Sequence, residues 1–207
     1  MKKALYVLLI LGSSSFAGII QGGYVGFGGG VANQIITFNQ TTFGITQPAI
    51  QLSSPVVGLA VRGVLGYNVN QVVGLELGNT YSFSTAHPTP NNVGTLNTIA
   101  NSTDGSLIIM IPSSYFGDLN AFGRIGMAYT SVNNTSSCNC GISSSADGSG
   151  VSDVLGAGIR YKLAYNWSIR AEWIGTGLFY PVALDAKSVN IGPWYQQQFL
   201  ATIAYHF

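Results

Sequence analysis

The sequence predicts an all-β protein, an eight-stranded antiparallel up-and-down transmembrane β-barrel. Three observations predict it: apolar and polar residues alternate with a period of two, charged residues are scarce, and short connections take turns with long ones. Only 7% of the 207 residues are charged, whereas 47% are apolar and 12% aromatic. Because ordinary soluble domains carry roughly a quarter charged residues, water alone is a poor solvent for this chain.

The N-terminus predicts a secretory signal peptide, residues 1–17. Two lysines precede an apolar run at residues 4–11, and small residues surround the expected cleavage site after Ala17. The run is too short for a membrane helix, which needs about 20 apolar residues. The mature domain, residues 18–207, is then nearly neutral, so it has no basic patch that would bind nucleic acid.

Eight segments of the mature chain show the strand pattern. They are residues 22–32, 56–67, 72–83, 106–112, 119–130, 152–163, 168–179 and 195–207. The connections between them are alternately short and rich in turn residues, or long and rich in Asn, Ser and Thr. Short turns at one end and long loops at the other are typical of a barrel in an outer membrane.

The two faces of each predicted strand separate charge from apolar surface. In the second segment, Leu59 and Val61 point to one side, while Ala60 and Arg62 point to the other. The exception is LIIMI at residues 107–111, which shows no alternation. A soluble barrel would need many charged residues on its outer face, but the polar face here is mostly Gly, Ala and Thr, which fits a crowded barrel interior.

Aromatic residues are predicted to mark the two edges of the lipid-facing band. They are Tyr67, Tyr81, Phe83, Tyr129, Tyr161, Phe179, Trp194 and Tyr205, which lie toward the strand ends.

The last nine residues, FLATIAYHF, alternate up to the final residue, so that Phe199, Ala201, Ile203, Tyr205 and Phe207 share one apolar face. A C-terminus ordinarily frays. We therefore expect this strand to pair with the first one and to close the barrel without a free edge.

The segments YVGFGGGVA, AFGRIGMAY, VLGAGIRYKLAYNWSIRAEW and FLATIAYHF, in this order, resemble the transmembrane domain of the OmpA-like/opacity-protein superfamily. The resemblance implies that Tyr205 and Phe207 form a C-terminal signal read by the barrel-insertion machinery. It also implies adhesins, structural proteins and a few enzymes as possible roles. Since the chain ends with the barrel, the peptidoglycan anchoring of OmpA is not expected.

Charged residues predict an ionic layer inside the lumen. Arg62 and Glu76 are equally distant from the centre of one short turn, and Arg160 and Glu172 from the centre of another, so each pair is expected to face across its hairpin. Arg124 lies at a similar height, roughly 10 to 15 Å up the strands. The two carboxylates are expected to bridge the three arginines as a structural brace, with a small gate as the alternative.

The sequence gives little support for a catalytic role of either histidine. His87 lies beside two prolines and His206 is the penultimate residue, and neither has a nucleophile and an acid at a recognisable spacing. A lipid A deacylase would need a histidine followed two residues later by a serine, a pattern that is absent. We expect no enzymatic activity, no cofactor and no metal.

Cys138 and Cys140 stand in the segment CNCG, within a predicted external loop. Export favours an oxidised pair, so a disulfide within the loop is the first expectation. A bridge to another chain is the second, and a metal site is a distant third because two thiolates alone are an incomplete zinc site.

These observations predict an integral outer-membrane protein that contacts membrane lipid, with a structural or adhesin-like role through its external loops. Host or cell-surface ligands are possible partners of those loops. A narrow ion channel gated by the charge layer is the alternative, and a lipid A-modifying enzyme is a more remote one.

Overall fold

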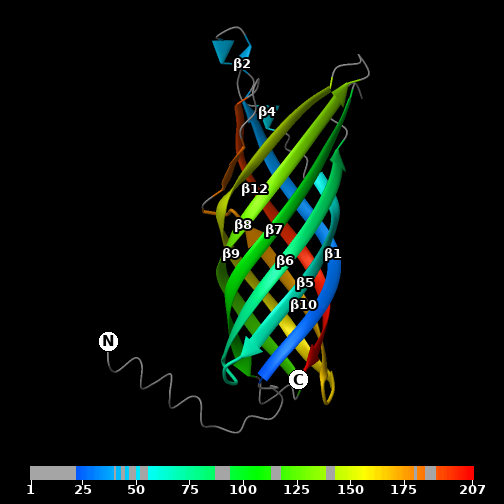
Figure 1. Cartoon of the computed structure of the whole chain (residues 1–207), viewed down its shortest axis with the longest axis vertical. Helices are drawn as coiled ribbons and strands as arrows, with labels where there is room; N and C mark the ends of the chain where they lie inside the picture. Colours follow the sequence, from blue (N-terminus) through cyan, green and yellow to red (C-terminus); the bar gives the residue numbers. More distant parts are fainter. Residues whose placement is uncertain are drawn as a thin grey trace, which may run out of the picture.

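The fold is a closed antiparallel β-barrel, which confirms the predicted fold class (Figure 1). The computed structural model describes residues 22–39, 41–42, 45–46, 50–51, 56–86, 94–112, 118–138, 143–179, 181–184 and 190–207. The predicted signal peptide, residues 1–17, lies outside the described residues. Within the described ranges no helix is long and apolar enough to cross a membrane.

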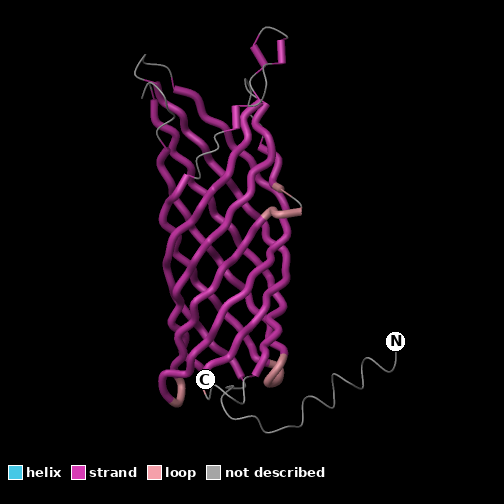
Figure 2. The backbone as a smooth tube through the Cα atoms, turned by 180° about the vertical axis from the view of Figure 1, so that it is seen from behind, coloured by secondary structure: helices cyan, strands magenta, loops and turns pink. Residues whose placement is uncertain are grey.

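Eight long strands build the barrel wall. They are β1 (Gly22–Asn39), β5 (Val56–Asn68), β6 (Val73–Ala86), β7 (Gly94–Pro112), β8 (Leu119–Cys138), β9 (Ser143–Ala164), β10 (Trp167–Thr176) and β12 (Asn190–His206). Each pairs antiparallel with its neighbours, and the front and back walls cross in Figure 2 because the strands tilt. The short strands are β2 (Thr41–Thr42), β3 (Ile45–Thr46), β4 (Ile50–Gln51) and β11 (Val182–Leu184).

The last strand closes the barrel against the first, as the C-terminal alternation predicts. β12 pairs with β1 from Tyr24 opposite His206 to Asn39 opposite Asn190, with one irregularity between Ile36 and Phe38. Every long strand therefore has a partner on both sides, and the barrel closes without leaving an edge strand among the eight. The C-terminus lies at the end of the barrel that carries the short turns (Figure 2).

Inward and outward faces follow the predicted alternation. On β5, Ala60 and Arg62 are buried, whereas Leu59 and Val61 are exposed on the outer face. The segment LIIMI also alternates: Ile108 and Met110 point into the lumen, and the three residues between and beside them point outward. The sequence did not reveal this alternation because the lumen near the short turns is itself partly apolar, so both faces of the segment carry apolar side chains.

Six of the eight predicted edge aromatics lie on the outer face of the strands, although Tyr129 stands near the middle of β8, and the other two depart from the prediction. Tyr67, Tyr81, Phe83, Tyr129, Tyr161 and Tyr205 are exposed on the outer face of the strands. Phe179 is exposed too, but it lies beyond the end of β10. Trp194 is fully buried and points into the lumen, where its Nε1 donates to Gln34 Oε1 at 3.4 Å. Its inward position follows from the β12 register, which places it on the same face as Gln196 and Gln198.

Several strands continue into segments that the sequence assigns to long loops. β7 begins at Gly94, and β8 and β9 run to Cys138 and from Ser143, so the external connections are shorter than predicted. β10, in contrast, ends earlier than predicted, at Thr176 rather than at residue 179. The Asn, Ser and Thr residues in the extensions lack apolar alternation because this part of the wall has no need of an apolar outer face.

Glycine at position 30 is required by close approach between strands. A Cβ there would collide with the carbonyl oxygen of Phe199 on β12, whereas a Cβ at Gly63 would meet no atom within 4 Å. We expect Gly30→Ala to lower the free energy of unfolding by about 1–3 kcal/mol, because β1 and β12 would have to separate. Gly63→Ala is the matched control and should stay within about 0.5 kcal/mol of wild type.

Urea unfolding of the refolded protein in detergent, followed by tryptophan fluorescence, measures both variants. Equal unfolding midpoints for Gly30→Ala and Gly63→Ala would contradict the close packing of β1 against β12.

Candidate functional site

A cluster of six ionised side chains fills the middle of the lumen. Its members, called here the ionic cluster, come from five strands and are Arg62, Glu76, Asp104, Arg124, Arg170 and Glu172. All six are buried, with exposed fractions of 5% or less. Three arginines face three carboxylates, so the cluster is electrically balanced, as a dry interior demands.

Glu76 lies at the centre of the ionic cluster. Its carboxylate forms ion pairs with Arg62 (Nη2 to Oε1, 3.3 Å) and Arg170 (Nη1 to Oε2, 2.6 Å), and a third with Arg124. The Tyr24 hydroxyl donates a further hydrogen bond to Oε2 at 2.8 Å. One carboxylate from β6 therefore binds donors from β1, β5, β8 and β10, which ties distant parts of the wall together.

Asp104 completes the network on the β7 side. Arg62 donates to both of its oxygens, at 2.6 and 3.0 Å, in the two-pronged geometry that suits a guanidinium and a carboxylate. Arg124 lies 3.5 Å from Oδ2, and the Ser106 hydroxyl donates to the same oxygen at 2.8 Å. Asp104 thus neutralises the side of Arg62 and Arg124 that Glu76 does not reach.

Glu172 is held more loosely. Its oxygens lie 3.2 Å from Arg124 Nη2 and 3.0 Å from Arg170 Nη2. Neither oxygen has a partner in hydrogen-bond geometry within the described part of the chain. Glu172 therefore contributes charge compensation without the directional bonds that hold Glu76 and Asp104.

Four of the five predicted residues of the layer lie together, and Arg62 pairs with Glu76 as predicted. Arg160 does not pair with Glu172, and neither predicted pair lies directly opposite across its hairpin. The structure brings Arg62, Glu76, Arg124 and Glu172 together and leaves Arg160 outside their ion pairs. Arg62 lies opposite Thr80, not Glu76, and Arg160 lies opposite Arg170, not Glu172.

Turn geometry explains the error. The β5–β6 turn is centred two residues later than the sequence suggests, which moves the register by four, and an irregularity follows Trp167 in the β9–β10 hairpin. The long Arg62 side chain bridges the first offset diagonally to Glu76 on the neighbouring strand β6.

Sequence reasoning missed two members of the ionic cluster. Arg170 alternates with Glu172 on the inward face of β10, so its position was readable, but its pairing with Glu76 depends on the curvature of the barrel. Asp104 lies in a segment that the sequence assigns to a long loop, and β7 in fact carries it into the lumen. Its inward position becomes evident only once β7 is known to begin at Gly94.

Apolar side chains flank the ionic cluster on both sides along the lumen. The upper ring consists of Ala32, Ala60, Ala128, Val154, Ile174 and Leu200. The lower side chains form two groups, Tyr24 with Val64 and Ala204, and Ile108 with Met110 and Phe122. On β5 the inward neighbours of Arg62 are Ala60 and Val64, one from each layer, which places the charges between two water-poor zones.

Amide side chains occupy the lumen above the upper ring. Gln196 donates to Ser82 Oγ at 2.7 Å, and Gln198 donates to Gln196 Oε1 at 2.7 Å. Gln34 joins them by accepting from Trp194. No group of three or more His, Cys, Asp or Glu side chains within the described ranges has a metal-binding arrangement.

The lower end of the lumen carries His206 and Arg160. His206 Nε2 lies 2.9 Å from Ser168 Oγ, a contact between a histidine and a hydroxyl that sequence spacing did not reveal. His206 Nδ1 is buried and has no hydrogen-bond partner among the described residues. Within the described residues, no third group orients the histidine as in a serine–histidine–acid triad.

The remaining predicted residues have no observable site chemistry. His87 and Cys140 lie outside the described residues, so the pairing of Cys140 with Cys138 lies outside them as well. Tyr205 and Phe207 are exposed on the outer face of the last strand, where Tyr205 packs edge-on against Trp167.

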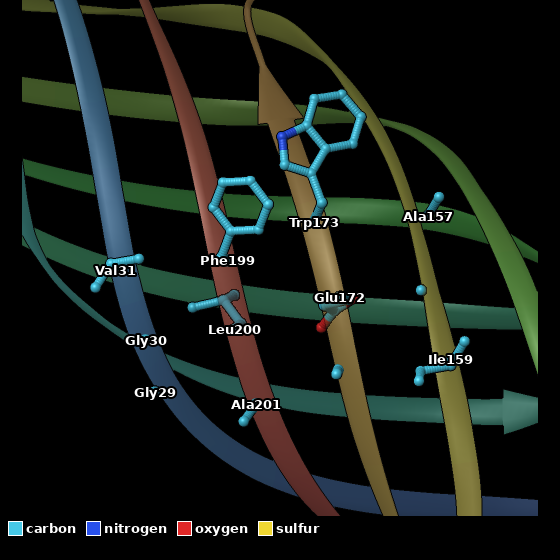
Figure 3. Close-up of a pocket in the computed structure, with 12 residues that line it drawn as sticks. Gly29, Gly30, Val31, Ala157, Ile159, Glu172, Trp173, Phe199, Leu200 and Ala201 are labelled. Carbon is cyan, nitrogen blue, oxygen red and sulfur yellow. The ribbon is translucent and has the colours of Figure 1, made fainter. Parts of the chain in front are cut away.

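The outer wall has a shallow depression across β1, β12, β10 and β9 (Figure 3). Its volume is about 500 Å³, and it forms where small residues replace large ones on the outer face, between Val31, Phe199, Trp173 and Ile159. Glu172 and Leu200 reach it only from behind, since their side chains are buried on the lumen side. The depression is apolar and offers no side-chain chemistry.

Comparison with known proteins places this barrel in a family. A solved structure of Neisserial surface protein A shares 12% identity with a TM-score of 0.59, covering 90% of this chain and 98% of that one. The Ail protein of Yersinia pestis shares 14% identity with a TM-score of 0.50, covering 91% and 100%. The outer membrane protein AlkL shares 13% identity with a TM-score of 0.52, covering 94% of each chain.

These likenesses show the fold alone, and no curated protein matches the sequence. The family model for the outer membrane protein β-barrel domain, however, matches residues 4–207, nearly the whole chain. The chain therefore belongs to the outer membrane protein β-barrel domain family.

Proposed function

We propose that this protein is a closed outer-membrane barrel with a structural or surface-binding role, and that it is neither an open pore nor an enzyme. The observation that carries the proposal is the ionic cluster, in which three arginines and three carboxylates fill the lumen from wall to wall. An eight-stranded barrel is just wide enough for side chains to fill it. Contacts with other molecules would then be made from outside the lumen.

The upper part of the wall supports a surface-binding role. Above the amide layer, β7, β8 and β9 extend to the end of the barrel opposite the C-terminus (Figure 1). Most of their outward side chains are small and polar, with Asn97, Asn133, Thr135 and Ser149 exposed, although Ile99 and Asp147 are exposed on the same face. Hydroxyl and amide groups on a rigid sheet suit uncharged hydrogen-bonding ligands such as glycans, because they donate and accept without a charge to desolvate.

A narrow channel is the second candidate, and Glu172 is the observation that favours it. Its carboxylate has ion pairs but no hydrogen bond within the described residues, so it is the member of the ionic cluster that moves at the lowest cost. A rearrangement there would open the cluster on the β10 side.

The bracing role predicts a loss of stability when a buried carboxylate is neutralised. Asp104→Asn should lower the free energy of unfolding by about 3 kcal/mol, because Arg62 and Arg124 would each lose a partner in a dry interior. Asp147→Asn is the matched control, since Asp147 is exposed on β9, and should change stability by less than about 0.5 kcal/mol. Urea titration in detergent measures the free energy of unfolding of both variants. Equal losses of stability in the two variants would contradict the bracing role.

Single-channel recording tests the closed lumen. We expect the refolded protein in a planar bilayer to pass no current, and the Glu76→Gln, Glu172→Gln double variant to stay silent, because the arginine side chains still fill the space. Asp147→Asn serves as the folded control. A current in wild type that changes in the double variant would support the gated channel and refute the closed barrel.

Shortening the β8–β9 hairpin tests the surface-binding role. Replacing residues 132–148 with Asn-Gly would join Ser131 to Ser149, which already lie opposite each other. One neighbour, Ail, was solved with the heparin analogue sucrose octasulfate, so neutral and sulfated glycans are the probes of choice. Proteoliposomes with the full chain should bind an immobilised glycan that the shortened protein does not. Equal retention of both proteins on every glycan would count against binding by this hairpin.

A further inference from the structure

Arg160 is a buried cation that the ionic cluster does not neutralise. It lies on the inward face of β9 and is 7% exposed. Its guanidinium crosses the lower lumen, where Nη1 lies 3.5 Å from Met110 Sδ on β7 and Cζ lies 5.2 Å from the centre of the Tyr24 ring on β1. A thioether and an aromatic ring attract a cation only weakly, and neither supplies a negative charge.

Within the described ranges, the buried lumen holds four arginines but only three carboxylates. All seven ion pairs of these ranges belong to the other three arginines, and none includes Arg160. Glu76 is the carboxylate nearest in the network, through the Tyr24 hydroxyl, but it is already shared by three guanidinium groups. An uncompensated charge in such a site costs several kcal/mol.

Other groups around Arg160 also favour negative charge. Besides Arg160, the half-buried Lys162 on the inward face of β9 adds positive charge at this end of the lumen, and both act electrostatically on His206. His206 lies against the same Tyr24 ring as Arg160, with centroids 5.3 Å apart. Its buried Nδ1 has no partner in the described part of the chain, and it becomes a free donor when Ser168 donates to Nε2.

We propose that the lower lumen is a binding site for a small inorganic anion, such as chloride or phosphate, with Arg160 as its principal ligand. His206 Nδ1 supplies a second donor, and Lys162, half-buried one inward position nearer the strand end, attracts the anion to the mouth. The apolar side chains and the ionic cluster above the site would hold the anion at this end. The site is independent of the surface-binding role and of the closed state of the ionic cluster.

Chloride binding to the refolded protein in detergent can be followed by the line width of the ³⁵Cl NMR signal, with methanesulfonate holding the ionic strength constant. Wild type should broaden the chloride line, and phosphate should compete with it. Arg160→Gln should weaken the effect about tenfold, because a charge-assisted hydrogen bond is lost. Arg160→Lys, which keeps the charge, should restore most of it.

Further variants and crystals distinguish a specific site from nonspecific attraction of chloride to the protein. Heat-dependent gel mobility establishes that each variant is folded, and Lys162→Gln should reduce chloride binding less than Arg160→Gln does. Crystals grown with bromide should show an anomalous peak beside the Arg160 guanidinium. Equal line broadening by folded wild type and Arg160→Gln, or bromide peaks only elsewhere on the protein, would overturn the proposal and leave adventitious ions only.

Discussion

Charge neutralisation inside a closed sheet is the constraint on which this structure depends. When β12 pairs with β1, side chains fill the interior of the eight-stranded barrel, and the buried guanidinium groups of Arg62, Arg124 and Arg170 are stabilised by carboxylates that face them in the lumen. Glu76 satisfies this demand for three arginines at once, and Asp104 and Glu172 satisfy what remains. The charges link strands that are distant in sequence, so the cross-lumen ion pairs supplement the hydrogen bonds of the wall.

The outer face of the barrel needs apolar side chains rather than paired charges. Large apolar side chains cover it between the two aromatic edges, as a lipid environment requires, and small polar residues take over on the extended upper strands. The layers inside follow a related order, with apolar side chains above and below the ionic cluster and amides toward the upper end. This stacking separates the charged middle of the lumen from both mouths, which favours a closed barrel.

The fold was predictable because a period of two is visible wherever one face meets lipid. Alternation therefore located seven of the eight strands and the closure of β12 on β1, whereas the apolar run at residues 107–111 was recognised as a strand without it. Alternation did not predict the part of β7 that extends above the lipid band through polar residues and carries Asp104. It also did not predict the burial of the large apolar side chains of Trp194 and Met110 inside the lumen. Pairing was harder still, because a two-residue error in the β5–β6 turn displaces the partner of Arg62 by four positions.

A double-mutant cycle on Arg62 and Asp104 tests most directly whether the ionic cluster acts as one unit. The free energies of unfolding of wild type, Arg62→Gln, Asp104→Asn and the double variant would be measured in the same detergent. We expect the double variant to lose less stability than the sum of the single changes, by about 1–3 kcal/mol, because each single change leaves a buried charge without a partner. Additivity within about 0.5 kcal/mol would contradict the claim that these charges sustain one another.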